Sequence, residues 1–183
     1  MSRPREELLG ILRRESGRFG RFRLASGAIS DVYVDARLTV LRSDAAWLVG
    51  AALLETMEEA GWKPAAVGGL AAGAIPLPSA VVMAAAAQGR ELAGFFVRKE
   101  AKAHGRGRAL EGIETPSGAA VILEDTATSG RSTRAAVEGA RAAGFEVIGA
   151  LALVDRDMGA AARLEEAGVP YRAVYRLEEL TAR

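Results

Sequence analysis

The stretch 121–132, VILEDTATSGRS, decides the fold of this 183-residue chain. Together with the alanines before it, its apolar start predicts a buried strand over 119–123, and two adjacent carboxylates, Glu124 and Asp125, follow directly. A hydroxyl-rich turn then opens a helix that the pattern predicts over 131–143. In open parallel sheets, ligands bind beyond the carboxyl ends of the strands, so this stretch is also the first candidate for a binding site.

Outward from this stretch, apolar strand patterns alternate with helical ones. The predicted strands are 65–69, 92–97, 119–123, 147–154 and one near 171–175. The predicted helices are 44–60 with Gly61 just beyond its end, 75–88, 131–143, one near 159–167 and a short terminal one. This order predicts an α/β fold, in which a central, mostly parallel sheet is flanked by helices within one domain over 1–183.

The first 40 or so residues depart from this alternation. Two short strands, 22–24 and 32–35, are predicted on either side of a turn at Ser26-Gly27. Before them, a helix over 4–15 has one apolar stripe, formed by Leu8, Leu9, Ile11 and Leu12. We therefore expect residues 1–40 to form a small segment against the main sheet. The residues expected to pack in the core or between helices include Trp47, Met57, Trp62 and Met83.

Composition excludes several classes of function. The net charge of +1 gives no global field that would attract nucleic acid or an anionic membrane, so neither is an expected partner. The chain has no cysteine and one histidine, which excludes disulfides, cysteine nucleophiles and multi-histidine zinc sites. The uncharged run 64–89 is interrupted by proline and glycine, which favours a strand, a turn and a buried helix over a membrane span.

Two further expectations concern the setting of the protein. The N-terminus leads into an amphipathic segment and not into a secretory signal, so we expect a cytoplasmic protein. Asparagine and cysteine are absent, glutamine occurs once, and arginine is abundant, which resembles the composition of a thermophile's proteins.

The turn after the acidic pair is suited to a phosphate. Backbone amides at a helix N-terminus bind anions, and Thr128, Ser129 and Ser132 add hydroxyl donors. Glu124 and Asp125 would repel that phosphate, so they need a diol or a cation such as magnesium. The stretch thus predicts a sugar-phosphate site. The alternative is a strand, turn and helix with an acidic pair near the surface and ordinary capping residues.

A basic run, Arg98-Lys99-Glu100-Ala101-Lys102-Ala103-His104, contains two of the three lysines and the single histidine. Gly105 and Gly107 follow, which predicts a mobile loop. Ammonium groups and an imidazole differ chemically from the guanidinium used elsewhere in the chain, which favours an anion-binding role. The alternative is a solvated basic stretch.

The stretch 121–132 resembles the 5-phosphoribosyl-1-pyrophosphate (PRPP) motif of type I phosphoribosyltransferases. The resemblance implies the fold of that family, with Glu124 and Asp125 on the ribose hydroxyls. It also implies a loop around the 5-phosphate formed by Thr126, Ala127, Thr128, Ser129, Gly130, Arg131 and Ser132. The basic run is similar to the catalytic loop of orotate phosphoribosyltransferases, which implies contacts with pyrophosphate from Arg98, Lys99, Lys102 and His104. Lys102 and Asp125 would be the catalytic residues.

Other segments between residues 19 and 160 resemble the same family in the same order. Residues 22–27, continuing to Ser30, Tyr33 and Asp35, look like its N-terminal substrate segment, and residues 68–76 like its pyrophosphate-side loop. The implied orotate-binding residues are Tyr33, Val34, Thr128 and Arg156. Two positions depart from the pattern, because some members carry lysines where this chain has Ala25 and Gly73.

The resemblance implies the reaction of orotate with PRPP to give orotidine 5′-monophosphate and pyrophosphate, a step in pyrimidine (UMP) biosynthesis. Magnesium would be held mainly through PRPP, with no direct protein ligand. The implied assembly is a homodimer in which the 98–108 loop reaches the partner's site. Two alternatives are a phosphoribosyltransferase for a purine or another base, and a non-catalytic PRPP-binding regulator.

Overall fold

The computed structural model describes residues 3–23, 29–99 and 110–182, and its central feature is a six-stranded sheet. The sheet runs in the order β5-β4-β3-β6-β7-β8, and its strands are parallel except for β5, which is antiparallel to β4. Their bounds are β3 (Ala66–Leu70), β4 (Ala93–Val97), β5 (Leu110–Glu111), β6 (Ala119–Ala127), β7 (Glu146–Asp155) and β8 (Tyr171–Arg176). The prediction of a mostly parallel sheet is confirmed.

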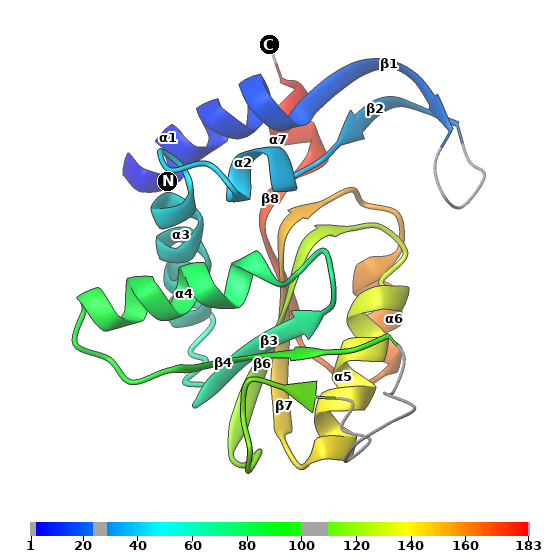
Figure 1. Ribbon diagram of the computed structural model, residues 1–183. Coiled ribbons are helices and arrows are strands. Elements are labelled where there is room, and N and C mark those ends of the chain that lie inside the picture. The colour runs from blue at the N-terminus through cyan, green and yellow to red at the C-terminus, as the bar shows by residue number, and fades with distance from the viewer. Residues whose placement is uncertain (1–2, 24–28, 100–109, 183) are drawn as a thin grey trace.

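Helices cover both faces of this sheet (Figure 1). On one face lie α3 (Ala46–Glu59) and α4 (Pro76–Ala87), and on the other lie α5 (Arg131–Ala143) and α6 (Ala160–Glu166). The predicted bounds of α5 are confirmed to the residue. Helix α3 is followed by Ala60 and then by Gly61 at φ 71°, a left-handed conformation in which glycine often stops a helix.

The N-terminal elements form a separate layer at the end of the sheet where α7 also lies (Figure 1). They are α1 (Arg3–Ile11), a π-helical turn η1 (Leu12–Ser16), β1 (Gly17–Arg23), β2 (Ile29–Val34) and α2 (Arg37–Val40); α7 spans Leu177–Thr181. Strands β1 and β2 pair antiparallel as a two-stranded sheet of their own. The turn predicted at Ser26-Gly27 lies outside the described residues.

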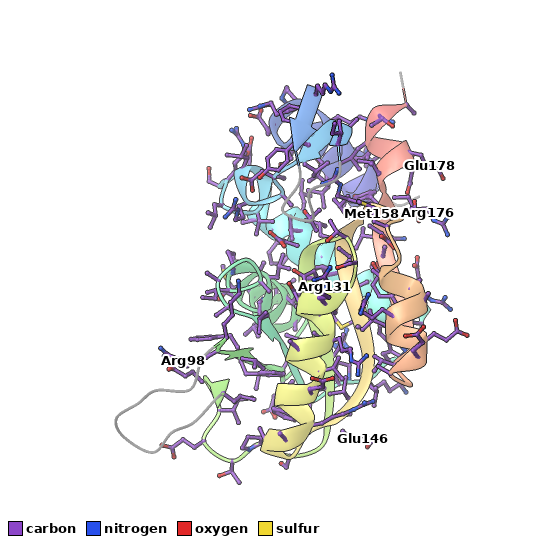
Figure 2. The ribbon with its side chains drawn as sticks, turned by 90° about the vertical axis from the view of Figure 1, so that its right-hand side faces the viewer. Arg98, Arg131, Glu146, Met158, Arg176 and Glu178 are labelled. Carbon is purple, nitrogen blue, oxygen red and sulfur yellow. The ribbon has the colours of Figure 1, made fainter. Side chains whose placement is uncertain are left out.

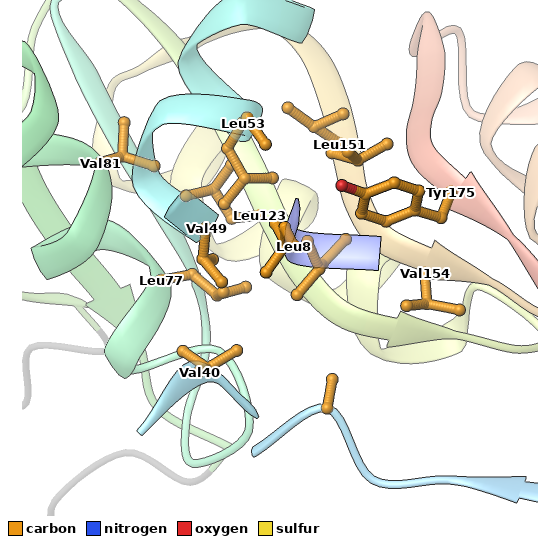
Figure 3. Close-up of a cluster of buried hydrophobic side chains, with 14 of the residues drawn as sticks. Leu8, Val40, Val49, Leu53, Leu77, Val81, Leu123, Leu151, Val154 and Tyr175 are labelled. Carbon is orange, nitrogen blue, oxygen red and sulfur yellow. The ribbon is translucent and has the colours of Figure 1, made fainter. Parts of the chain in front are cut away.

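The larger core joins this N-terminal layer to the α3–α4 face of the sheet (Figure 3). The apolar stripe predicted for the first helix is buried there and includes Leu8 and Leu12, both 0 % exposed. Met57 is buried and Trp62 packs against this core, as predicted. Trp47 and Met83 are 47 % and 66 % exposed, so the prediction that they pack inside is wrong for these two residues. Apolar character alone does not say which face of a helix meets the core.

Strand β6 is longer than its apolar run predicts. It continues through the acidic pair to Ala127, because its pairing with β7 continues through Thr126 opposite Val154 and Ala127 opposite Asp155. The carboxylates therefore stand within the strand and not after it. The two-residue β5 and the four-residue α2 were not predicted, since elements this short leave no periodic pattern.

The uncharged run 64–89 forms β3, a loop and most of α4. Among the described residues, none of the helices has both the length and the apolar character needed to cross a membrane.

Helices α3 and α4 cross closely at Gly50, where a Cβ atom would lie 2.1 Å from the backbone oxygen of Ala80. We expect Gly50→Ala to destabilise the fold by about 1–3 kcal/mol, because the added methyl group would push the two helices apart. Gly10 in α1 is the matched control, since a Cβ atom there meets nothing within 4 Å. Gly10→Ala should be stabilising by about 0.5–1 kcal/mol through helix propensity alone. Urea unfolding of both variants measures the difference, and equal effects would contradict the close crossing.

Candidate active site

The two carboxylates of β6 point to opposite faces of the sheet, because consecutive side chains of a strand alternate. Glu124 lies on the α5 side, where its Oε2 accepts a hydrogen bond of 2.9 Å from the Thr133 hydroxyl. Asp125 lies on the side of the loop between β3 and α4, where a Cβ atom added to Gly73 would be 3.4 Å from its Oδ1. The end of β6 therefore presents a carboxylate on each side.

Glu124 is almost fully enclosed, with 9 % of its surface exposed. Burial, followed by the negative charge of neighbouring Asp125, raises the pKa of the Glu124 carboxyl to about 7. The hydrogen bond from Thr133 and the ammonium group of Lys99 oppose this shift. An isolated buried carboxylate is costly, so this position favours a partner that can donate hydrogen bonds or supply positive charge.

The turn 128–130 leads from β6 into α5 and surrounds a small pocket. Gly130 precedes the helix with φ 71°, and no side chain caps the first amides of α5 within the described chain. The hydroxyl of Thr126 is buried and has no hydrogen-bond partner among the described residues. Glu124, Thr133 and the whole predicted phosphate loop line this pocket, the loop residues being Thr126, Ala127, Thr128, Ser129, Gly130, Arg131 and Ser132. Figure 2 shows Arg131 at the first turn of α5.

The loop between β3 and α4 closes the other side of the β6 end. Just before this loop, Gly69 of β3 approaches β6 so closely that a Cβ atom would lie 2.3 Å from the backbone oxygen of Leu123. The peptide bond between Ala71 and Ala72 is cis. Of the two departures from the family pattern, Gly73 faces Asp125, and Ala25 lies outside the described residues.

Three of the four predicted orotate-binding residues meet where β2 lies beside the loop after β7. The Arg156 side chain is 6 % exposed, and its Nη2 donates a hydrogen bond of 2.8 Å to the backbone oxygen of Val32. Tyr33 is 38 % exposed and contacts Phe22, while Val34 is buried. Burial lowers the pKa of the Arg156 guanidinium, which nevertheless stays charged at neutral pH. Thr128, the fourth residue, belongs to the phosphate loop.

Arg37 is a candidate that sequence reasoning missed. Its guanidinium forms two hydrogen bonds of 2.8 Å with the carboxylate of Asp35. Asp35, and more weakly Asp125, raise the pKa of Arg37, so this cation lies within electrostatic reach of the acidic pair. The sequence feature that could have identified Arg37 is the spacing Asp35-x-Arg37 directly after the second strand. This spacing lets the Asp35 carboxylate hold the guanidinium at the end of the strand.

The basic run is only partly described. Lys102 and His104 lie outside the described residues. Arg98 forms an ion pair with Glu111 of β5, and Figure 2 places it apart from Arg131. Lys99 is exposed and close enough to Glu124 to influence its pKa. Within the described residues the structure therefore brings Lys99, but not Arg98, toward the acidic pair.

This geometry suits a ligand with separate hydroxyl and phosphate groups. In the described ranges, no three or more histidine or acidic side chains form a group that could hold a metal ion. Glu124 and Asp125 can accept hydrogen bonds from hydroxyls at the end of β6, while the amides of the loop and of α5 can bind a phosphate. The donor set also fits a cation that a phosphorylated ligand brings with it.

Comparison with known proteins agrees with this geometry. No family model matches the chain. The chain is 48 % identical over 162 residues to the orotate phosphoribosyltransferase of Streptomyces avermitilis, covering 88 % of each protein. It is 43 % identical over 181 residues to that of Streptomyces coelicolor, covering 98 % of each. A crystal structure of the Mycobacterium tuberculosis enzyme in complex with PRPP is 36 % identical with a TM-score of 0.80, and the match covers 97 % of this chain and 99 % of that one. Near-complete coverage at this identity shows that the chain belongs to the orotate phosphoribosyltransferase family.

Proposed function

We propose that the end of β6 is the site at which this chain transfers the 5-phosphoribosyl group of PRPP to orotate, giving orotidine 5′-monophosphate and pyrophosphate for pyrimidine biosynthesis. The observation that carries the proposal is that two features lie together at the end of β6. These are the two carboxylates, Glu124 and Asp125, on opposite faces of the strand, and the N-terminus of α5, which no side chain caps in the described chain. The adjacent cluster of Arg156, Tyr33 and Val34 would bind the base. The PRPP complex of the mycobacterial relative supports the substrate.

The ribosyl group would be held from both sides of β6. Glu124 and Asp125 would accept hydrogen bonds from the two ribose hydroxyls, and the loop Thr126–Ser132 would bind the 5-phosphate. Displacement at an anomeric carbon passes through an oxocarbenium-like transition state. The negative charge of Asp125, the proposed catalytic carboxylate, would favour that developing cation.

The base would enter beside Arg156. Its guanidinium has five N–H donors, so the hydrogen bond to Val32 is compatible with recognition of the orotate carboxylate. The backbone at Tyr33 and Val34 would meet the edge of the pyrimidine, and the Thr128 hydroxyl would contact the base from the phosphate loop. The attacking nitrogen of orotate would thus face the anomeric carbon.

The leaving group needs positive charge. Arg98, Lys99, Lys102 and His104 would stabilise the departing pyrophosphate, with Lys102 as the catalytic cation. Magnesium bound to PRPP would supply further electrostatic stabilisation, and the residues present fit an ion held mainly by PRPP oxygens. Closure of the basic loop would exclude water, which would otherwise hydrolyse PRPP.

The chain would act as a homodimer in which the 98–108 loop of each protomer serves the partner's site. Several large apolar side chains on or next to α2, on α3, in the loop before α4 and on α4 are exposed, and contact with a partner would cover them: Leu38, Leu41, Trp47, Ile75 and Met83 are 46, 71, 47, 40 and 66 % exposed. A hollow of about 280 Å³ beside Ile75, also lined by Val82 and Phe96, could receive apolar side chains of the partner.

The wider proposals rest on composition and pattern. Residues 1–183 would form one domain with a substrate-capping segment over about 1–40. The absence of cysteine supports a location in a reducing compartment such as the cytoplasm. Abundant arginine and the absence of asparagine support a thermophilic source, which a mesophilic unfolding temperature would contradict.

Pyrophosphate release from PRPP tests the proposed reaction and its two alternatives. We expect release to require orotate and magnesium and to be absent with purine bases. Arg156→Lys should raise the KM for orotate about tenfold, because a single ammonium group cannot reproduce a bidentate pair. Arg172→Lys on the exposed edge of β8 is the control. Release with a purine, or no turnover of any base despite PRPP binding, would support an alternative function.

The raised pKa of Glu124 predicts a pH-dependent cost in the stability of the fold. Its carboxyl titrates near pH 7 when folded and near 4.5 when unfolded, so the wild type loses stability as pH rises through this window. The loss is nearly complete about one pH unit above 7 and is on the order of 3 kcal/mol. Without ligand, the free energy of unfolding of Glu124→Gln minus that of wild type should be larger at pH 8 than at pH 5. The turnover of PRPP by the variant should fall.

Urea unfolding at the two pH values measures this difference. Exposed Glu138, which pairs with Arg134 on the surface of α5, provides the control variant Glu138→Gln. The same difference between Glu124→Gln and wild type at pH 5 and pH 8 would show that Glu124 is not held in the protonated form.

The proposal that the 98–108 loop of each protomer serves the partner's site makes a quantitative prediction. Lys102→Ala and Asp125→Asn should each fold normally and turn over slowly. If the loop acts in the partner's site, each mixed dimer contains one site with both residues intact and one site with neither. Equal mixing makes about half of the dimers mixed, so about a quarter of wild-type activity should return. No recovery, after subunit exchange has been demonstrated by native mass spectrometry, would mean that each site is built within one chain.

A further inference from the structure

Helix α6 packs directly against the turn 128–130, which lies within the phosphate loop. A Cβ atom at Gly130 would lie 3.0 Å from the Cα and 3.2 Å from the backbone oxygen of Ala160, the first residue of α6. Ala127, Ala152 and Ala160 form a small buried cluster beneath this contact. Small side chains therefore let the two backbones touch, and α6 forms the outer wall of the loop.

Arg163 extends this contact from the next turn of α6. Its Nε donates a hydrogen bond to the backbone oxygen of Ser129 in a partly buried setting. Ser129 and Gly130 both line the pocket at the end of β6. The mechanism above gives Arg163 no role, and sequence reasoning did not identify it.

Peptide geometry gives this hydrogen bond a consequence for the ligand. A trans peptide unit is planar, so the C=O of Ser129 and the N–H of Gly130 point in opposite directions. A carbonyl turned toward the pocket would repel a phosphate, whereas an amide turned toward it would donate to one. By holding the Ser129 oxygen on the α6 side, Arg163 directs the Gly130 amide to the pocket side.

We propose that Arg163 is a positioning residue that fixes the Ser129–Gly130 peptide, so that the phosphate loop presents its amide to the 5-phosphate of PRPP. The proposal rests on the proposed function of this loop. Arg163 acts through the backbone of Ser129, so its loss should affect ligands that carry the phosphate and leave orotate binding unchanged.

Arg141 offers a matched control. It lies on α5 and donates from Nη1 to the backbone oxygen of Ala167, at 3.1 Å, just beyond the end of α6. This is the same type of bond between a guanidinium and a carbonyl, and it also ties α6 to its neighbour. It differs by being exposed and away from the phosphate pocket.

The test compares Arg163→Met, Arg163→Lys and Arg141→Met, since methionine keeps much of the apolar stem of arginine. Ribose 5-phosphate binding, measured by calorimetry without orotate, should weaken about tenfold in Arg163→Met, as expected for a lost charge-assisted contact. The KM for PRPP should rise while the KM for orotate and the unfolding midpoint stay unchanged. Arg163→Lys should recover part of the affinity, and Arg141→Met should bind as wild type does. The Gly130 amide resonance should shift in Arg163→Met only.

Equal ribose 5-phosphate affinity in wild type and Arg163→Met would overturn the inference. So would a parallel rise of both KM values with a lowered unfolding midpoint, which would indicate a merely structural bond. If wild type itself fails to bind ribose 5-phosphate, the proposed phosphate site falls, and that result is distinct from a failure of Arg163 alone.

Discussion

The double pairing of β6 is the constraint on which the rest of the structure depends. This strand is hydrogen-bonded to β3 on one side and to β7 on the other, and its residues 120–123 are at most 1 % exposed. A shift of one residue would exchange the faces of Glu124 and Asp125, because side chains alternate along a strand. The ladders that order the core therefore also decide which carboxylate meets α5 and which meets the loop containing Gly73.

The segments around the end of β6 are fixed by close backbone contact more than by side chains. Gly69 approaches the Leu123 oxygen, and Gly130 approaches the start of α6, at distances where a Cβ atom would clash or crowd. Side-chain bonds then refine this frame, as Thr133 does for Glu124 and Arg163 for Ser129. The glycines, which have no side chain, set the distances between the backbone segments of this site, and a few polar side-chain contacts set the orientation of the groups in it.

Sequence patterns predict the parts of this architecture that depend on local periodicity. Helix α5 has an amphipathic pattern and a glycine at each end, so its bounds could be predicted to the residue. The continuation of β6 to Ala127 depends on pairing with β7, which no local pattern contains. The same holds for the exposure of Trp47, for the electrostatic influence of Asp125 on Arg37, and for the contact between Arg163 and Ser129, which is 34 residues away in the chain.

The two halves of the candidate site rest on different supports. The acidic pair and the phosphate loop belong to β6 and α5, inside the main sheet and its helix layer. Tyr33 and Val34 belong to a separate two-stranded sheet, tied to the main one by contacts such as the hydrogen bond from Arg156 to Val32. A small change in that hairpin would move Tyr33 and Val34, the proposed base contacts, relative to Asp125 without disturbing the proposed phosphate loop. The proposed base contacts are therefore divided between two supports, because Tyr33 and Val34 belong to the hairpin while Arg156 and Thr128 are fixed to the end of β6 and its loop.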